Sequence, residues 1–300
     1  MAIQLKPKEI LADPANLLCP CEDHECRWHG NCKDCLALHR YYRTVPNCLA
    51  AETSEGFKDA VVTLSDSDII REVKAQLAVD MNCSPGGFDS EGFVFCEAVE
   101  HPERRPFPRD ATHFQMLTMG GATVVSATPD ILPGIREQLC DKSRDEAFSM
   151  PFVVGNMYYF YYLPSNMTLL PLPDRVELTV VEKGEVELLY TVPGDFSNAL
   201  QYDLSHNRPD VLAIVAKVDG VVAGIAGASE DCAMLWQIGV DVLPEYRRHG
   251  IAAVMVNRLA NEILKRGKVP YYGTSSANIA SQRTALKAGM TPAWVVGSSV

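Results

Sequence analysis

The most constraining feature of this 300-residue chain is a series of short apolar runs followed by one long amphipathic segment, all within residues 211–267. Two β-branched runs, VLAIVAKV and VVAGIAGA, flank the dipeptide Asp219-Gly220. This dipeptide is typical of the type I′ turn of a β-hairpin. A third strand is expected over 233–242, and apolar residues recur at helical spacing over 250–267. The pattern predicts an antiparallel meander that leads into a helix.

The order of elements after this helix predicts the direction of the strands. A strand (VPYYGTSS, 269–276), a second helix (NIASQRTALKAG, 278–289) and a last strand (TPAWVVGSSV, 291–300) follow. Strands that a helix connects without a hairpin run parallel. We therefore expect an α/β (mixed α+β) fold in which helices flank a central mixed sheet.

The junction VLPEYRRHGIA, residues 242–252, lies where the third strand ends and the long helix begins. Backbone N–H groups at a helix N-terminus lack partners within the helix and lie at the positive end of its dipole, so they favour an anion. Gly250 and Ala252 allow close approach, and Arg247 and Arg248 add positive charge. The pattern indicates a site for a pyrophosphate. The alternative is an ordinary turn with a solvated basic surface.

This junction resembles motif A of the GNAT superfamily of acyl-CoA-dependent N-acyltransferases, whose signature is [QR]-x-x-G-x-[GA]. Arg247 to Ala252 meet the signature, and Val242, Pro244 and Arg247 match its V-x-P-x-x-R lead-in. The resemblance extends over residues 176–298 and implies acetyl-CoA as cosubstrate. The coenzyme-binding residues that it implies are Val242, Arg247, Arg248, His249, Gly250, Ile251, Ala252, Asn278 and Ser281.

The resemblance implies transfer of an acetyl group from acetyl-CoA to a primary amine of a small molecule or protein, by direct attack in a ternary complex. The alternative is a non-catalytic acyl-CoA sensor or adaptor. Asn278 is either a contact for the pantetheine arm, as in the family, or simply a helix N-cap. Family members carry a tyrosine acid seven residues after this asparagine, where Ala285 stands here. Water, Tyr271, Tyr272 or a residue from the middle of the chain would then protonate the thiolate.

Asp241 is the candidate catalytic base. It is the one carboxylate in the strand LWQIGVDV, where alternation places it on the same face as Gln237 and Gly239. An amine must lose a proton before it attacks a thioester, and a carboxylate among apolar neighbours can have the raised pKa that this needs. The alternative is a solvated aspartate at the end of a strand.

Six of the ten cysteines lie within the first 48 residues, spaced C-x-C-x4-C-x5-C-x2-C-x12-C. Such spacings bring thiolates within reach of one tetrahedral ion, and interleaved histidines favour structural zinc. An iron–sulfur cluster and a metal-free or redox role are the alternatives. This segment also resembles a short cysteine-rich module of bacterial proteins. A subset of the following residues would bind the metal: Cys19, Cys21, Cys26, Cys32, Cys35, Cys48, His29 and His39.

The remaining sequence divides the chain and limits its partners. We expect a cysteine-rich module over 1–54, an α/β extension or degenerate GNAT-like half over 55–165, and an acetyltransferase core over 166–300. In the middle segment, Thr128 is expected to cap a helix that starts at Pro129. The net charge of −11 argues against nucleic-acid binding. The sequence contains neither a signal-peptide pattern nor an apolar run of membrane-spanning length, which predicts a cytoplasmic protein without a membrane partner.

Overall fold

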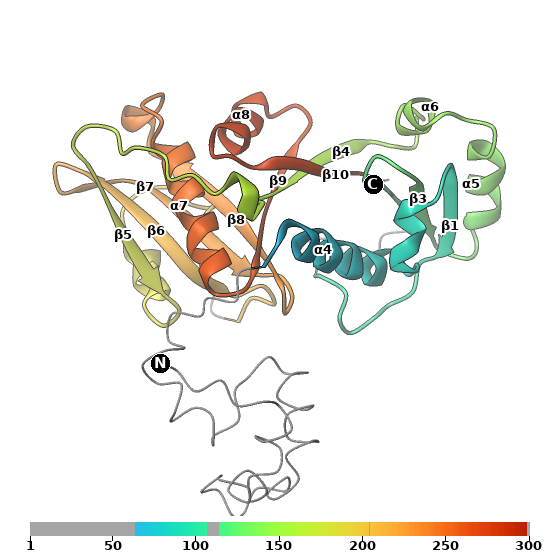
Figure 1. The fold of residues 1–300 in the computed structure, drawn as a ribbon, viewed down its shortest axis with the longest axis horizontal. Helices are drawn as coiled ribbons and strands as arrows, with labels where there is room; N and C mark the ends of the chain where they lie inside the picture. Colours follow the sequence, from blue (N-terminus) through green and yellow to red (C-terminus); the bar gives the residue numbers. More distant parts are fainter. Residues whose placement is uncertain (1–63, 107–113, 204, 299–300) are drawn as a thin grey trace, which may run out of the picture. The chain divides into compact units, whose positions relative to one another are not determined.

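A computed structural model describes residues 64–106, 114–203 and 205–298 of the chain, so the cysteine-rich module lies outside the described residues. Within these ranges one sheet of ten strands has the order β1-β3-β2-β10-β4-β9-β8-β7-β6-β5 (Figure 1). The strands are β1 (Phe93–Glu97), β2 (Phe114–Thr118), β3 (Thr123–Ala127), β4 (Gly155–Tyr161), β5 (Val176–Glu182), β6 (Asp210–Val218), β7 (Val221–Glu230), β8 (Leu235–Val242), β9 (Val269–Ser275) and β10 (Thr291–Ser298).

The predicted meander and the parallel strands after it are confirmed. β6 pairs antiparallel with β7, and Asp219 and Gly220 have the positive φ angles of a type I′ turn, 50° and 81°. β7 pairs antiparallel with β8, and β8 pairs parallel with β9 across helix α7 (Ile251–Lys265). The mixed sheet and its flanking helices are therefore those that the sequence predicts.

Strand β4, from the middle of the chain, takes the place beside β9. It pairs antiparallel with β9 on one edge and with β10 on the other, and β10 in turn pairs antiparallel with β2. The single strand expected after the last helix is thus present, but it does not lie next to β9. The division expected at residues 165/166 falls between β4 and β5, which belong to the same sheet.

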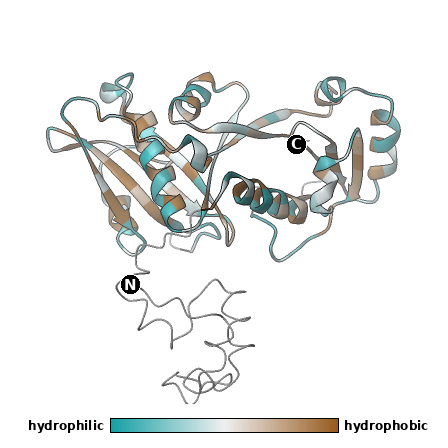
Figure 2. Cartoon of the chain, viewed as in Figure 1, coloured by the Kyte–Doolittle hydropathy of each residue, from teal (hydrophilic) through white to brown (hydrophobic). Residues whose placement is uncertain are grey.

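Each face of the sheet is covered by its own set of segments. On β6, Leu212, Ile214 and Ala216 face the core under α7, whereas Ala213 and Val215 face a core under the 3₁₀ turn η4 (Val186–Thr191) and the following loop. Helices α4 (Asp66–Met81) and α8 (Ile279–Lys287) contribute to the same core as α7. The other face of β2 and β3 packs against α5 (Leu132–Leu139) and α6 (Arg144–Phe148). Figure 2 shows hydrophobic and hydrophilic residues on different sides of α4 and α7, as this packing requires.

Local signals decide where the helices begin. α4 begins with a capping box, in which Ser65 and Asp68 bond to each other's backbone N–H. The expected start of α5 at Pro129 is wrong, because only the Leu132 N–H makes a helical bond back to the Thr128 carbonyl and Pro133 has no N–H with which to continue the series. The helix consequently begins at Leu132. None of the helices in the described ranges is long and apolar enough to cross a membrane.

Candidate functional site

A cavity of about 1150 Å³ opens where β8 and β9 part from each other. The two strands pair from Leu235 and Val269 as far as Ile238 and Tyr272, and no further. Beyond this point β8 continues to follow β7 as far as Val242, while β9 follows β4 as far as Ser275. Each strand keeps its other neighbour, so a wedge opens between them and exposes the backbone of one edge of each.

The N-terminus of α7 forms one wall of this cavity. Gly250 is the N-cap residue, with φ 82°, and no side chain caps the helix. Arg248 also has a positive φ, 68°, and the Arg247 guanidinium donates to the carbonyl oxygen of Val242 over 2.9 Å. The chain therefore turns sharply from strand to helix, and the first amide groups of α7 lie at the cavity wall. Such a helix start favours a bound anion.

Most of the predicted coenzyme-binding residues line the cavity. His249 alone of that set does not lie among the residues of its wall, and it is exposed. The structure brings the others together from the end of β8, the start of α7 and the start of α8. These residues are Val242, Arg247, Arg248, Gly250, Ile251, Ala252, Asn278 and Ser281.

Helix α8 supplies the opposite wall. Asn278 caps the helix, since its side chain accepts from the N–H of Ser281 over 3.1 Å. The Ser281 hydroxyl lies 2.7 Å from the Tyr272 hydroxyl, which also lines the cavity, and burial raises the pKa of Tyr272. Tyr271, the other expected proton donor, is buried outside the cavity wall and hydrogen-bonds to Asp231. Ala285 is also buried, so no side chain projects into the cavity there.

Two basic residues of α8 line the cavity and were missed in the sequence analysis. Arg283 and Lys287 lie one turn apart on the same side of the helix as Thr284. The Lys287 amine is 3.4 Å from the place that a β-carbon on Gly250 would take, so it lies beside the start of α7. The signal was available in the sequence, because these residues follow Ala280 at helical spacing.

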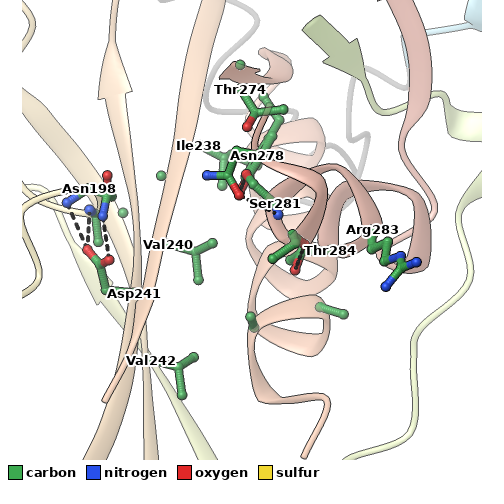
Figure 3. Close-up of a pocket in the computed structure, with 18 of the residues that line it drawn as sticks. Asn198, Ile238, Val240, Asp241, Val242, Thr274, Asn278, Ser281, Arg283 and Thr284 are labelled. Atoms are coloured by element: carbon green, nitrogen blue, oxygen red, sulfur yellow. Dashed lines mark hydrogen bonds between the residues drawn. The ribbon is translucent and has the colours of Figure 1, made fainter. Parts of the chain in front are cut away.

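Asp241 points to the opposite side of β8 from Val240 and Val242 (Figure 3). Its carboxylate accepts hydrogen bonds from the backbone N–H groups of Asn198 and Ala199, over 2.8 and 3.1 Å, and from the Asn198 amide over 2.7 Å. The aspartate thus fastens a loop onto the sheet. This arrangement favours a structural role and differs from the solvated strand end that was the alternative.

The cavity passes through the sheet, because its wall includes residues from both faces of β8. Ile238, Val240 and Val242 belong to the α7 face, whereas Gln237 and Gly239 belong to the face of Asp241. On that second face, the loop 197–201, Arg208 and Ser229 complete the wall. Sequence reasoning missed this side because it is formed by a loop with no regular pattern.

Arg208 is held on this second face by a buried polar cluster. Its Nη1 donates to the Gln237 side-chain oxygen over 2.9 Å and lies 3.5 Å from the Asp231 carboxylate. Asp231 is buried and also accepts from Ser229, over 2.6 Å, and from Tyr271. Burial is the main reason that the pKa of Tyr271 lies well above its ordinary value, so its hydroxyl stays protonated and donates.

No group of histidine, cysteine and acidic side chains in the described ranges could hold a metal ion. The predicted ligands Cys19 to Cys48 lie outside these ranges, so the zinc site stays a prediction.

A cavity that crosses a splayed sheet, with an uncapped helix start on one side and a polar cluster on the other, defines a protein that can hold a long anionic ligand against a second, smaller molecule.

The family comparison agrees with this class. Residues 184–290 match the sequence model of the acetyltransferase (GNAT) family, and the matched segment contains β6 to α8. The match supports a GNAT acetyltransferase domain over these residues. No curated protein matches the chain.

Three solved structures illustrate the likeness. A GCN5-related N-acetyltransferase from Kribbella flavida is 19% identical, with 48% of this chain and 58% of that chain covered and a TM-score of 0.35. A GNAT-family acetyltransferase from Colwellia psychrerythraea is 16% identical, with coverage of 49% and 56% and a TM-score of 0.36. An aminoglycoside N-acetyltransferase in complex with CoA is 19% identical, with coverage of 42% and 93% and a TM-score of 0.31. The chain spans little more than half the length of the first two proteins.

Proposed function

We propose that the protein is an acyl-CoA-dependent N-acetyltransferase that transfers an acetyl group from acetyl-CoA to a primary amine, by direct attack in a ternary complex. The observation that carries this proposal is the cavity between β8 and β9, which joins the start of α7 on one face of the sheet to a polar pocket on the other. A thioester lying in the wedge would be reached by an amine from the second face.

The coenzyme would lie on the α7 and α8 side. The first amide groups of α7 would bind its pyrophosphate, with Arg248, Arg283 and Lys287 near enough to add positive charge. The unpaired edge of β8 after Ile238 would offer backbone groups to the amides of the pantetheine arm. Asn278 would contribute less than the resemblance implies, because its side-chain oxygen already caps α8.

The chemical step would proceed by addition and elimination. The amine nitrogen attacks the thioester carbonyl carbon, a backbone N–H near Val242 stabilises the oxyanion, and the C–S bond then breaks. The departing thiolate takes a proton. Tyr272 is the favoured donor because this residue lines the cavity and its hydroxyl is hydrogen-bonded to Ser281, another residue of the wall, whereas Tyr271 is engaged by Asp231. Water would take the proton that the amine must lose.

Ala252→Glu tests the coenzyme site. Ala252 lies in the first turn of α7 at the cavity wall, and a carboxylate there would repel a pyrophosphate and block its approach. We expect acetyl-CoA affinity, measured by calorimetry, to fall by about 10- to 100-fold, which corresponds to about 1.4–2.8 kcal/mol. Gly250 is a poorer target, because at φ 82° any side chain would also strain the backbone.

The matched control is Ala75→Glu, which adds the same charge to an exposed position of α4. Its affinity for acetyl-CoA should equal that of the wild type. Equal affinity in both variants would refute the proposed coenzyme site. Thiol release from acetyl-CoA with a panel of amines tests the reaction itself, and tight coenzyme binding without turnover would favour the non-catalytic acyl-CoA sensor instead.

A further inference from the structure

The charged side chains that line the cavity separate into two groups. Arg247 and Arg248 precede the start of α7, and Arg283 and Lys287 lie on α8, on the side where the coenzyme phosphates would bind. Arg208 is the one cation of the wall in the described ranges that lies on the other side of the sheet, where the acceptor would enter. Among the described residues of the wall, Asp241 is the only carboxylate, and it is engaged by Asn198 and Ala199.

This distribution of charge disfavours one class of acceptor. Amines that carry several positive charges need carboxylates that neutralise them, and the described wall offers none that is free. Asp231 is buried behind the wall and already accepts from Ser229 and Tyr271. A polycationic amine would therefore meet Arg208 without a compensating acid.

Arg208 is oriented in a way that leaves part of its guanidinium group available. Nη1 alone bonds to Gln237 and approaches Asp231, and the side chain is 19% exposed. In the described part of the chain, no protein atom accepts a hydrogen bond from Nε or Nη2 of Arg208. Neither nitrogen is among the buried atoms that lack a partner, so both remain accessible. These two nitrogens form the side of the guanidinium fork that binds a carboxylate through two parallel hydrogen bonds.

We propose that Arg208 binds an acid group of the acceptor, so that the substrate class is a small primary amine that also carries a carboxylate, such as an amino acid. The proposal rests on the proposed acetyltransferase function. The Gln237 and Asp231 contacts hold the guanidinium in place before the substrate arrives, which lowers the entropy lost on binding. Arg208 is thus a specificity-determining residue and takes no part in the proton transfers.

The test compares amines in matched pairs, each an amino acid and its amide, for example glycine with glycinamide and lysine with lysinamide. Spermidine and an aminoglycoside represent the polycationic class. For the wild type we expect kcat/KM to be about 10- to 100-fold higher for the acid than for its amide, the range of hydrogen bonds to a charged group. A preference for the amide or for the polycations would overturn the proposal.

Arg208→Gln should abolish this preference by raising KM for the acid, while the acetyl-CoA affinity and the amide kinetics stay unchanged. Asp231 keeps Ser229 and Tyr271 in this variant, so the fold should persist, and the midpoint of thermal unfolding checks it. Arg208→Lys, which keeps the charge and loses the fork, should recover only part of the preference. Arg144→Gln, outside the cavity, is the matched control and should behave as the wild type. An equal loss for acid and amide would show that Arg208 is merely structural.

A second measurement does not depend on turnover. Phenylglyoxal should modify Arg208 in the wild type, as peptide mass spectrometry can show, and glycine with CoA present should slow this modification at least several-fold more than glycinamide does. Equal protection by both compounds would contradict the proposal even if no amine in the panel is acetylated. Failure to bind acetyl-CoA at all would instead refute the proposed function, so the two failures are distinguishable.

Discussion

Two glycines on neighbouring strands make room for the loop that Asp241 fastens. A β-carbon on Gly227 would lie 1.9 Å from the Ala199 carbonyl oxygen, and one on Gly239 would lie 1.7 Å from the Asn198 carbonyl oxygen. Neither position therefore tolerates a side chain while the loop stays in place. The loop borders the cavity on the face of Asp241, so these contacts between single residues set the shape of the pocket there.

Asp241→Asn tests whether Asp241 holds this loop on the sheet. The variant replaces the carboxylate that accepts three hydrogen bonds from the loop with an uncharged amide. We expect the free energy of unfolding to fall by about 1–3 kcal/mol. The loop would loosen and KM for the acceptor would rise, while acetyl-CoA affinity and the shape of the pH–rate profile would be unchanged. Chemical denaturation and a full pH profile check these outcomes.

Asn198→Ala is the companion variant, because it removes one of the same hydrogen bonds without touching the carboxylate. It should reproduce part of the loss of stability. If Asp241 were the general base, Asp241→Asn would lower turnover by roughly a hundredfold and remove the acidic limb of the profile, whereas Asn198→Ala would not.

At the scale of elements, the structure brings together two cysteines that lie apart in the sequence. Cys83 follows the C-cap of α4 and Cys96 lies in β1, and the Asn82 side chain bridges the two segments by donating to the Glu97 carbonyl over 2.9 Å. Interaction with the Cys83 thiol lowers the pKa of Cys96 to about 7, while the same interaction, together with burial, raises the pKa of Cys83. Of the two thiols, Cys96 is therefore expected to ionise first.

Alkylation rates test this pair. With a pKa of about 7, roughly half of Cys96 is thiolate at pH 7, so iodoacetamide should modify it about tenfold faster than it does in Cys83→Ala, which lacks the donor. Because the pKa is lowered, the advantage should fade as pH rises above about 9. Peptide mass spectrometry gives both rates, and Cys140, an exposed thiol, should react equally in the two proteins. An unchanged Cys96 rate in Cys83→Ala would contradict the assignment.

The elements that could be predicted from the sequence are those whose signal lies within a few residues. Asp219-Gly220 fixes a hairpin locally, and the junction at 242–252 predicts the start of α7, which the structure confirms. The place of β4 could not be predicted, because its register with β9 depends on packing between segments far apart in the chain. Arg208 was missed for the same reason, since only the folded sheet brings it to Gln237.

At the scale of the whole molecule, the cysteine-rich segment 17–50 has too few apolar residues for a core of its own, so metal binding should supply its folding free energy. We expect elemental analysis of protein purified without chelator to find about one or two zinc ions per chain. Cys32→Ser should lower this content, whereas Cys140→Ser, in the described part of the chain, should not. Protein that contains neither zinc nor iron, and in which all six clustered thiols titrate freely, would contradict the metal site.

The position of β10 between β2 and β4 has a consequence for the order in which the protein is assembled during translation. β6, β7 and β8 pair with their neighbours in sequence and can do so as soon as they are synthesised. β10 is made after every other described strand, and until then the edges of β2 and β4 that it will cover are unpaired. A nascent chain paused before residue 291 would thus expose two open strand edges to neighbouring chains or to chaperones.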